Sequence, residues 1–388
     1  TISEIVDGRV TISDIKDLNI DDLLNRDKVK PDINLLHKNI KNKIVLVTGA
    51  GGSIGSELCR QIIKLKPRKL ILQELNEFAL YKIYEELKFY DKKKKIISLL
   101  SDSQDQENLE IIFETFKVNT VYHTAAYKHV PLVEENICAG VKNNVFSTLA
   151  VAKASINKKI SNLVLISSDK AVRPTNIMGV TKRISELCLQ GIYQKNKNKN
   201  LNFSIVRFGN VLDSSGSVIP KFREQIKKGG PITLTHKEVT RYFMTIKEAA
   251  QLVIQAGAIS KGGDVFLLDM GDPIKIYDLA INMIQLSGLS LRNPQNKNGD
   301  IEIMITGLRP GEKLFEELLL SDLPEKTIHP KIYKSNEPFI KFEKLSVEID
   351  KMENYINVNN LEMILENLQK LVTGFNPNNN ILDHTFLK

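Results

Sequence analysis

The stretch Ile44–Gly55, IVLVTGAGGSIG, decides the fold of this chain. An apolar run of strand length opens it, and three glycines follow at three-residue spacing, Gly49, Gly52 and Gly55. Glycines at such a turn let the backbone bend tightly and approach a pyrophosphate, which then binds at the amide-rich start of the next helix. A glycine triplet alone is a weak signal, but this one directly follows a predicted strand. The stretch therefore predicts the nucleotide-binding turn of a strand–helix–strand unit.

The chain around this turn alternates between short apolar runs and helical patterns. The runs are Ile44–Val47, Leu70–Leu72, Ile96–Leu100, Thr120–His123, Leu163–Ile166 and Phe203–Phe208. Between them, apolar residues recur every three or four positions in Ser56–Lys66, Glu77–Lys88 and Asn143–Ile156. Alternation of strands and helices predicts parallel pairing with helices on both faces. We expect an α/β protein with a doubly wound, Rossmann-type parallel sheet and a smaller mixed lobe.

Glycine and proline clusters divide the chain further. Gly229-Gly230-Pro231 and Lys261–Asp264 interrupt the regular pattern after residue 210, and the chain is expected to return to the main sheet at Val265–Leu268. A short helix is suggested at Asp21–Leu24, and an amphipathic helix near Leu361–Leu371. The expected parts are an extension packing on the core (1–42), a nucleotide-binding domain (43–209), a mainly substrate-binding lobe with return strands (210–334) and a helical tail (335–388).

Composition excludes several classes of protein. The hydrophobic fraction of 42% and charged fraction of 26% are those of a soluble globular protein, and no apolar run is long enough to span a membrane. The net charge of +8 lies partly in lysine clusters that read as solvated, and no nucleic-acid module accompanies them. The surplus fits an anionic small substrate or an acidic bilayer. Three widely separated cysteines lack metal-ligand spacing, so we expect no metal site.

The second predicted strand ends at Glu74, nineteen residues after Gly55. A carboxylate there accepts hydrogen bonds from the hydroxyls of an adenosine ribose and repels a 2′-phosphate, which favours NAD over NADP. Glu77 could serve instead of Glu74. Asp102, just past the third strand, is placed either to receive the adenine amino group or to cap its own loop.

Five motifs in order carry a specific resemblance. They are TGAGGSIGSEL (48–58), HTAAYKHVPLVE (123–134), SSDKAVRPTNIMGVTK (167–182), RFGNVLDSSGSVIP (207–220) and TGLRPGEKLFEE (306–317). With them the chain resembles the extended short-chain dehydrogenases of the nucleotide-sugar 4,6-dehydratase group. It resembles in particular the large bacterial UDP-N-acetylglucosamine 4,6-dehydratases that carry a membrane-anchored amino-terminal region. The resemblance runs from about Ile20 to Lys334.

The resemblance implies a reaction. Such enzymes oxidise the sugar C4 hydroxyl with NAD, lose water across C5 and C6, and return the hydride to C6. It assigns Ser168 to the C4 oxygen, Asp169 as the acid that protonates the leaving hydroxyl, and Lys170 as the base at C5. Lys182 would hold the nicotinamide ribose. An adjacent acid and base can share this work if their surroundings separate their pKa values.

Met178 breaks the pattern, because the superfamily normally reads Tyr-x-x-x-Lys where this chain has Met178 and Lys182. A thioether has no proton to give and accepts one very poorly. The C4 deprotonation then falls to Asp169, directly or through water, in preference to Lys170. Tyr127 and Tyr242 are conceivable substitutes for the missing tyrosine, although aromatic packing explains each of them better.

Further contacts follow from the same resemblance. The cofactor residues would be Gly49, Gly52, Ser53, Ile54, Gly55, Glu74, Asp102, Ala125, Ala126 and Lys182. The substrate residues would be Lys128, His129, Asn210, Ser217, Val218, Pro220, Arg241, Arg309 and Glu312. Arginine suits the diphosphate because its planar fork binds phosphate oxygens in pairs. Arg173 is either a further contact or a structural ion-pair partner.

The leading interpretation is a UDP-N-acetylglucosamine 4,6-dehydratase of bacterial glycan synthesis or protein glycosylation. A nucleotide-sugar 4-epimerase shares the fold and the first oxidation but needs no Asp–Lys pair. A catalytically silent nucleotide-sugar-binding protein is a third possibility, supported by Met178 alone. We expect a homo-oligomer, a dimer or larger, with no nucleic-acid partner. The chain opens on Thr1, which suggests a fragment or a processed product. The resemblance implies that it is the cytoplasmic domain of a protein anchored in the inner membrane.

Overall fold

The computed structural model describes residues 29–91, 94–197, 201–317, 324–376 and 383–384. The helix suggested at Asp21–Leu24 lies outside them. The described chain forms two compact units. The larger comprises Val29–Phe208, Lys247–Asp269 and the described residues from Glu317 onward, and the smaller comprises Gly209–Ile246 and Met270–Glu316. Residues 247–269 fall inside the range expected to be mainly the substrate-binding lobe, but they belong to the larger unit.

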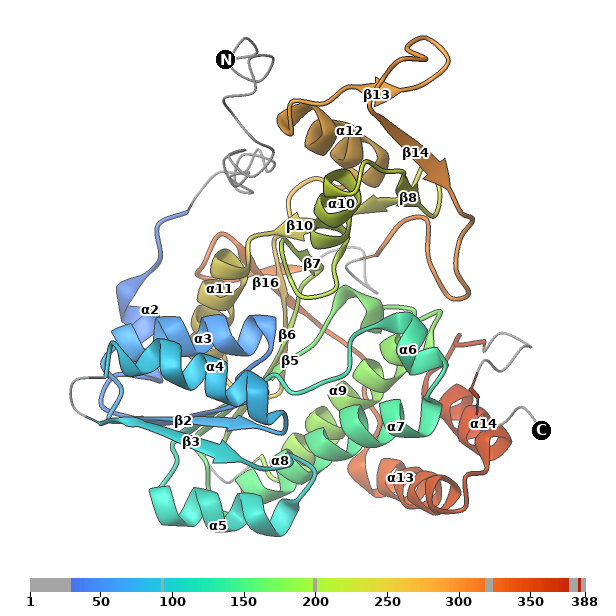
Figure 1. The fold of residues 1–388 in the computed structure, drawn as a ribbon. Helices are drawn as coiled ribbons and strands as arrows, with labels where there is room; N and C mark the ends of the chain where they lie inside the picture. Colours follow the sequence, from blue (N-terminus) through green and yellow to red (C-terminus); the bar gives the residue numbers. More distant parts are fainter. Residues whose placement is uncertain (1–28, 92–93, 198–200, 318–323, 377–382, 385–388) are drawn as a thin grey trace. The chain divides into compact units, whose positions relative to one another are not determined.

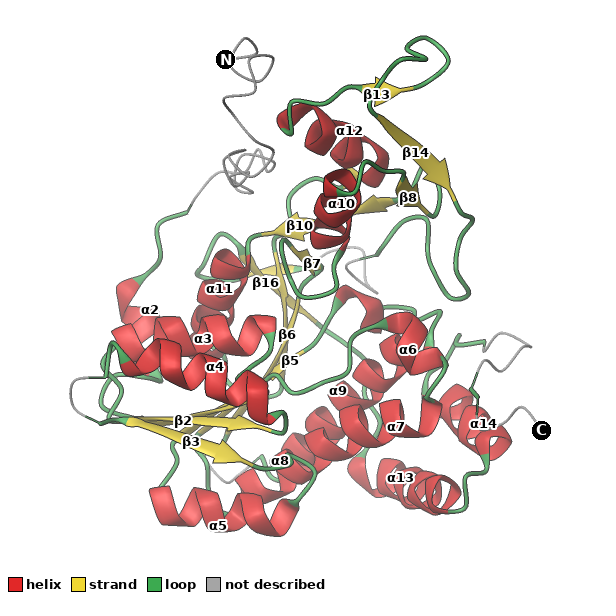
Figure 2. Ribbon diagram, viewed as in Figure 1, coloured by secondary structure: helices red, strands yellow, loops and turns green. Residues whose placement is uncertain are grey.

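The larger unit is built on one sheet, which has nine strands in the described chain (Figures 1 and 2). Its order is β15-β16-β11-β6-β5-β4-β1-β2-β3. The strands are β1 (Ile44–Thr48), β2 (Lys69–Glu74), β3 (Ile96–Leu100), β4 (Thr120–His123), β5 (Asn162–Ile166), β6 (Asn202–Arg207), β11 (Asp264–Leu268), β15 (Glu325–Lys326) and β16 (Ile332–Ser335). In this spatial order, every neighbouring pair of strands from β11 to β3 is parallel, and β16 is antiparallel to β11. From β1 the chain runs outward to β3 and then crosses back to β4, so the doubly wound fold predicted from the sequence is confirmed.

Helices cover both faces of this sheet (Figure 1). One face carries α3 (Ser53–Lys64), α4 (Glu77–Lys88) and α11 (Ile246–Ile259), and the other α5 (Gln106–Phe116), α8 (Ser147–Asn157) and α9 (Ile177–Lys195). Every residue of β1 is buried as a result. A strand covered on both sides buries most of its side chains, which is why the central strands read as nearly continuous apolar runs. Short elements link them: α2 (Ile33–Lys38), α6 (Val130–Glu134), α7 (Ile137–Val141), the π-helical η3 (Lys142–Phe146) and the 3₁₀ turn η4 (Asp169–Ala171).

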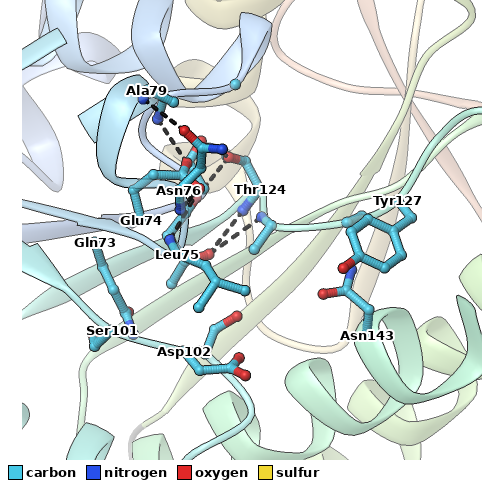
Figure 3. Close-up of a pocket in the computed structure, with 17 residues that line it drawn as sticks. Gln73, Glu74, Leu75, Asn76, Ala79, Ser101, Asp102, Thr124, Tyr127 and Asn143 are labelled. Carbon is cyan, nitrogen blue, oxygen red and sulfur yellow. Dashed lines mark hydrogen bonds between the residues drawn. The ribbon is translucent and has the colours of Figure 1, made fainter. Parts of the chain in front are cut away.

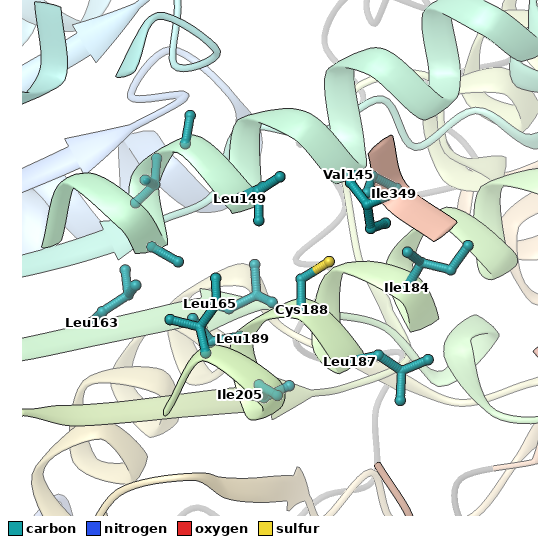
Figure 4. Close-up of a cluster of buried hydrophobic side chains, with 14 of the residues drawn as sticks. Val145, Leu149, Leu163, Leu165, Ile184, Leu187, Cys188, Leu189, Ile205 and Ile349 are labelled. Atoms are coloured by element: carbon teal, nitrogen blue, oxygen red, sulfur yellow. The ribbon is translucent and has the colours of Figure 1, made fainter. Parts of the chain in front are cut away.

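The core of the larger unit lies between β5, β6, α8 and α9 (Figure 4). Leu165 of β5 packs in the same cluster as Leu187 and Cys188 of α9. Ile349 joins it from α13 (Phe342–Asn357), which precedes α14 (Leu361–Leu371). The helix predicted at Leu361–Leu371 is therefore present, and α13 was not anticipated. Met178 also belongs to this cluster, with 4% of its surface exposed.

The smaller unit has its own core. Phe222 of α10 (Val218–Lys227) packs with Met283 of α12 (Ile276–Leu286) over a short parallel sheet. That sheet comprises β13 (Leu291–Arg292), β14 (Ile301–Ile305) and β8 (Ile232–Leu234). Two further pairs complete the unit: β7 (Asn210–Val211) with β10 (Phe243–Met244), and β9 (Thr240–Arg241) with β12 (Ile274–Lys275).

Candidate functional site

The glycine turn between β1 and α3 is tightly packed. Gly49 has a φ of +63°, and a Cβ there would lie 2.8 Å from the Cα atom of Ala125. A Cβ on Gly55 would lie 2.1 Å from the carbonyl oxygen of Gly49. Gly52 caps α3, whose first turn is Ser53, Ile54 and Gly55. Side chains at Gly49 and Gly55 would force the backbone apart, so the glycine spacing has a steric cause.

A cavity of about 460 Å³ opens beside this turn, in the larger unit (Figure 3). Of the residues predicted to bind the cofactor, it is lined by Gly49, Gly52, Glu74, Asp102, Ala125 and Ala126. Lys182 is not among its lining residues. Several other lining residues were not predicted from the sequence, among them Gln73, Leu75, Asn76, Ser101, Thr124 and Asn143. Their common signal is position, because most follow the carboxyl end of a parallel strand, where ligands of doubly wound folds bind.

Glu74 joins the glycine turn to the start of α4. Its Oε2 accepts a hydrogen bond of 2.9 Å from the Gly51 N–H, and its Oε1 accepts bonds of 3.0 and 3.1 Å from the Leu75 and Asn76 N–H groups. These contacts fix the carboxylate at the cavity wall. Glu77, the alternative from the sequence, lies in the first turn of α4 and does not line the cavity.

Asp102 caps its own loop, which is one of the two roles that the sequence suggested for it. Its Oδ1 accepts a hydrogen bond from the Gln104 N–H at 2.9 Å, and its Oδ2 accepts one from Gln104 Nε2 at 3.2 Å. The same residue lines the cavity. Capping of its own loop and exposure to a ligand are therefore compatible.

The end of β5 brings Ser168, Asp169 and Lys170 together. Asp169 is 1% exposed, and its Oδ1 accepts hydrogen bonds from Ser168 Oγ at 2.8 Å and Lys170 Nζ at 3.1 Å. No described residue pairs with its second oxygen, Oδ2. The Lys170 side chain is 19% exposed. A buried carboxylate thus shares one oxygen with a hydroxyl and an ammonium group and keeps the other available.

Met178 and Lys182 lie four residues apart on α9. The Met178 side chain packs in the apolar cluster, so the position of the missing tyrosine has no polar role in this chain. Lys182 is 6% exposed, and its Nζ donates a 2.6 Å hydrogen bond to the carbonyl oxygen of Ile166. Burial lowers the pKa of Lys182 to about 8, against the opposing attraction of Glu186. Burial, aided by Lys182, also lowers the pKa of His123 to about 3, which keeps that imidazole neutral.

A buried ionic network lies next to the Ser168–Lys170 loop. Ser167 Oγ donates to Glu186 Oε1 at 2.7 Å, and Arg207 binds both carboxylate oxygens of Glu186 at 2.7 and 2.6 Å. Arg207 also donates to Glu337 Oε1 at 2.7 Å. Burial would raise the pKa of Glu186, but Arg207 and Arg183 lower it to about 2. The network ties β5, β6 and α9 together next to Ser168. The sequence did not reveal it, because its members are far apart along the chain.

The segment after β4 is held by η3. The Tyr127 N–H donates to Asn144 Oδ1 at 2.7 Å, and Asn144 Nδ2 donates to the Tyr127 carbonyl oxygen at 3.0 Å. Tyr127 lines the cavity and is 47% exposed. Next to it, burial lowers the pKa of Lys128, and burial with the charge of Lys128 lowers the pKa of His129. Asn144 is a site residue that the sequence reading missed.

The other predicted substrate residues lie in the smaller unit. Arg241 pairs with Glu312 at 3.3 Å and with Glu316 at 3.7 Å, and the Arg309 N–H donates to Glu312 Oε2 at 3.2 Å. Burial and the charge of Arg309 lower the pKa of Lys221, while Glu312 opposes them. Lys221 is thus a third cation near Glu312, in addition to Arg241 and Arg309, and it was not predicted from the sequence. The remaining members are Ser217, which caps α10, Val218 and Pro220 in its first turn, and Asn210 in β7.

Some expectations concern structure rather than chemistry. Arg173 forms an ion pair with Glu317, as one of its two sequence readings proposed. Among the described residues, no group of three or more His, Cys, Asp or Glu side chains is arranged to hold a metal ion. No helix in the described part of the chain is both long and apolar enough to cross a membrane.

Residues 45–337 match the family described as "Polysaccharide biosynthesis protein". The chain belongs to this family. Over 357 residues it is 45% identical to the capsular polysaccharide biosynthesis protein CapD of Staphylococcus aureus, covering 91% of this chain and 58% of that protein. The chain thus spans little more than half the length of this curated relative.

Two more distant relatives have different activities in their names. The inverting UDP-N-acetylglucosamine 4,6-dehydratase of Campylobacter jejuni is 28% identical over 86% of this chain and 91% of its own. A UDP-glucose 4-epimerase of Rickettsia rickettsii is 28% identical over 85% of this chain and 95% of its own. Family membership therefore allows dehydration and epimerisation alike.

Solved structures have the same fold. The X-ray structure of Pen from Bacillus thuringiensis has a TM-score of 0.68 and 33% identity, covering 80% of this chain and 98% of its own. A double mutant of the dTDP-glucose 4,6-dehydratase DesIV from Streptomyces venezuelae, with NAD bound, has a TM-score of 0.61 and 18% identity over 71% of this chain and 87% of its own.

Proposed function

We propose that this chain is an NAD-dependent UDP-N-acetylglucosamine 4,6-dehydratase that makes a UDP-4-keto-6-deoxy sugar for bacterial glycan synthesis or protein glycosylation. The observation that carries the proposal is the contact between buried Asp169 and partly exposed Lys170 at the end of β5. Elimination of water needs an acid at one carbon and a base at the next, and adjacent groups of opposite type can supply both.

The cavity beside the glycine turn suits NAD. Its volume, the close-packed glycines and the helix start fit a dinucleotide pyrophosphate. Glu74 would accept the ribose hydroxyls and would repel a 2′-phosphate. NAD held there would supply reversible hydride transfer between the sugar C4 and C6. Ala125 and Ala126 leave room beside the turn for the nicotinamide half.

The protein supplies the proton transfers. Ser168 Oγ, which donates to Asp169 Oδ1, is the hydroxyl that would pass the C4 proton towards that carboxylate. The proton received from C4 would make Asp169 the acid that protonates the departing C6 hydroxyl. Lys170 would act as the base that takes the C5 proton, and it would return a proton to C5 after the hydride has reached C6.

Met178 does not contradict this division of work. Its thioether packs in the core, so no proton step can pass through it. Lys182, when protonated, would place a positive charge next to the Ser168–Lys170 loop, and it would bind the nicotinamide ribose. In the smaller unit, Arg241, Arg309 and Lys221 would bind the diphosphate, as their shared partner Glu312 suggests.

A nucleotide-sugar 4-epimerase is the second candidate, favoured by the relative of that name. Epimerisation needs one acid–base group at C4 and no separate base at C5, so the Asp169–Lys170 pair favours dehydration. The test is to incubate the purified protein with UDP-N-acetylglucosamine and to identify the product by NMR. A 4-keto-6-deoxy sugar is expected. A C4 epimer that keeps its C6 hydroxyl would establish epimerisation, and recovery of unchanged substrate would favour a silent binding protein.

We also propose a setting for the enzyme. Nucleotide sugars are charged and made in the cytoplasm, so the site would face that compartment. A membrane anchor, which the name of the membrane protein MJ1061 of Methanocaldococcus jannaschii supports, would lie in a part of the protein that this chain does not include. Assembly into a dimer or larger homo-oligomer can be checked by light scattering.

A further inference from the structure

Two buried polar groups in the cavity wall have no hydrogen-bond partner in the described chain. Gln73 is 1% exposed, and neither its Nε2 nor its Oε1 is paired. Ser101 Oγ is likewise buried and unpaired. Both residues line the cavity. Most buried side-chain polar atoms in proteins are hydrogen-bonded, because an unpaired one loses its hydration without compensation. A ligand in this cavity would supply the missing partners.

The two residues face a different part of the cavity from Glu74. Gln73 and Glu74 are consecutive in β2, and consecutive strand side chains point to opposite faces of the sheet. The Glu74 carboxylate turns to the Gly51 N–H of the glycine turn. The Gln73 side chain instead extends towards Ser101, which follows β3 and precedes Asp102 (Figure 3).

We propose that Gln73, together with Ser101, recognises the adenine base of the dinucleotide. The proposal rests on the NAD binding proposed above. A carboxamide presents one acceptor and one donor side by side. Adenine presents the matching pair, its N6 amino group beside the N7 or N1 acceptor, and glutamine can bind adenine through two hydrogen bonds in this way. Ser101 Oγ can donate to a further ring nitrogen or accept from the amino group.

Other parts of the cofactor fit these atoms less well. A pyrophosphate offers only acceptors, so it would leave the Gln73 Oε1 unpaired. The ribose hydroxyls are matched by the Glu74 carboxylate at the glycine turn. A base edge is the group that satisfies both atoms of the amide at once.

The test replaces Gln73 by leucine, which has nearly the same shape and no polar atoms. Loss of a two-bond contact to a base should weaken NAD binding roughly 5- to 150-fold, as measured by calorimetry. The melting temperature without cofactor should stay the same or rise, because an unpaired amide is removed from the interior. A purely structural glutamine would instead lower the melting temperature when lost.

Tyr122→Phe is the matched control. Tyr122 is fully buried in β4 of the same sheet, its hydroxyl has no hydrogen-bond partner among the described residues, and it does not line the cavity. Its loss should leave both the melting temperature and NAD affinity nearly unchanged. Unchanged NAD affinity in Gln73→Leu would overturn the proposal. Failure of the unaltered protein to bind NAD at all would instead refute the proposed function.

A base-modified cofactor locates the contact. In 1,N6-ethenoadenine dinucleotide, the N6 amino hydrogens and the N1 acceptor are blocked. The unaltered protein should bind this analogue more weakly than NAD, and Gln73→Leu should narrow that difference. An equal difference in the two proteins would show that Gln73 does not contact the base edge.

Discussion

Replacing Lys182 by methionine should make the protein more stable and less active. Lys182 is buried, and burial lowers its pKa from 10.5 to about 8. At about 1.36 kcal/mol for each pH unit, this shift means that the charged lysine costs the folded protein about 3 kcal/mol. Methionine removes that cost but loses the hydrogen bond to Ile166 O, worth about 1 kcal/mol. The net gain in the free energy of unfolding at pH 7 is then about 2 kcal/mol.

The gain should depend on pH in a defined direction. Between about pH 8 and pH 10.5, unfolded Lys182 keeps its proton while folded Lys182 has lost it. Stability rises with pH wherever the unfolded state binds more protons, so the wild-type penalty is complete below pH 8 and fades above it. The advantage of Lys182→Met should therefore shrink from about 2 kcal/mol at pH 7 to near zero at pH 10.

Urea unfolding of both proteins at pH 7, 8.5 and 10 measures this difference. Lys153→Met is the control, because Lys153 is an exposed lysine on the neighbouring helix α8 and carries no comparable burial cost. Its stability difference should be small and independent of pH. A Lys182→Met protein that is less stable than wild type at pH 7, or a difference that does not change with pH, would refute the reasoning.

Four further substitutions test the proposed chemistry. Asp169→Asn and Lys170→Ala should each lower turnover by a factor of about 10²–10⁴. Both variants should still bind the UDP-sugar, as measured by calorimetry. Only Lys170→Ala should still accumulate NADH when substrate is added, as measured by absorbance. Near-normal turnover of Asp169→Asn would contradict its assignment. Glu74→Ala should narrow the preference for NAD over NADP in binding assays, and equal affinity of the unaltered protein for both would show that Glu74 is not the selector. Met178→Ala should lower the melting temperature, because it leaves a cavity in the core. The folded variant should turn over at a rate closer to wild type than Asp169→Asn or Lys170→Ala. Abolished turnover in the folded variant would show that Met178 has a catalytic role.

The parts of the fold that depend on local pattern could be predicted from the sequence. Apolar runs covered on both sides, such as Ile44–Val47, are recognisable because nearly every side chain is apolar. The glycine turn was predictable because Gly49 and Gly55 occupy positions where a Cβ would collide with the backbone. The helix α14 followed from its spacing of apolar residues.

The parts that depend on contacts between distant segments could not be predicted. Glu186 and Arg207 form a buried ion pair, but each alone reads as an ordinary surface charge. The π-helical segment that turns Asn144 towards Tyr127 has no recognisable sequence signal. Gln73 looked like part of an ordinary strand, and only the structure shows that its amide is buried in a cavity wall without a hydrogen-bond partner among the described residues.

The central claim is that one active site removes a hydride from C4, eliminates water and delivers the same hydride to C6. UDP-N-acetylglucosamine deuterated at C4 tests this most directly, with the product analysed by NMR. The account predicts a 4-keto-6-deoxy sugar that carries the deuterium at C6 and a solvent-derived hydrogen at C5. Deuterium that remains at C4 in a product with an intact C6 hydroxyl would contradict it.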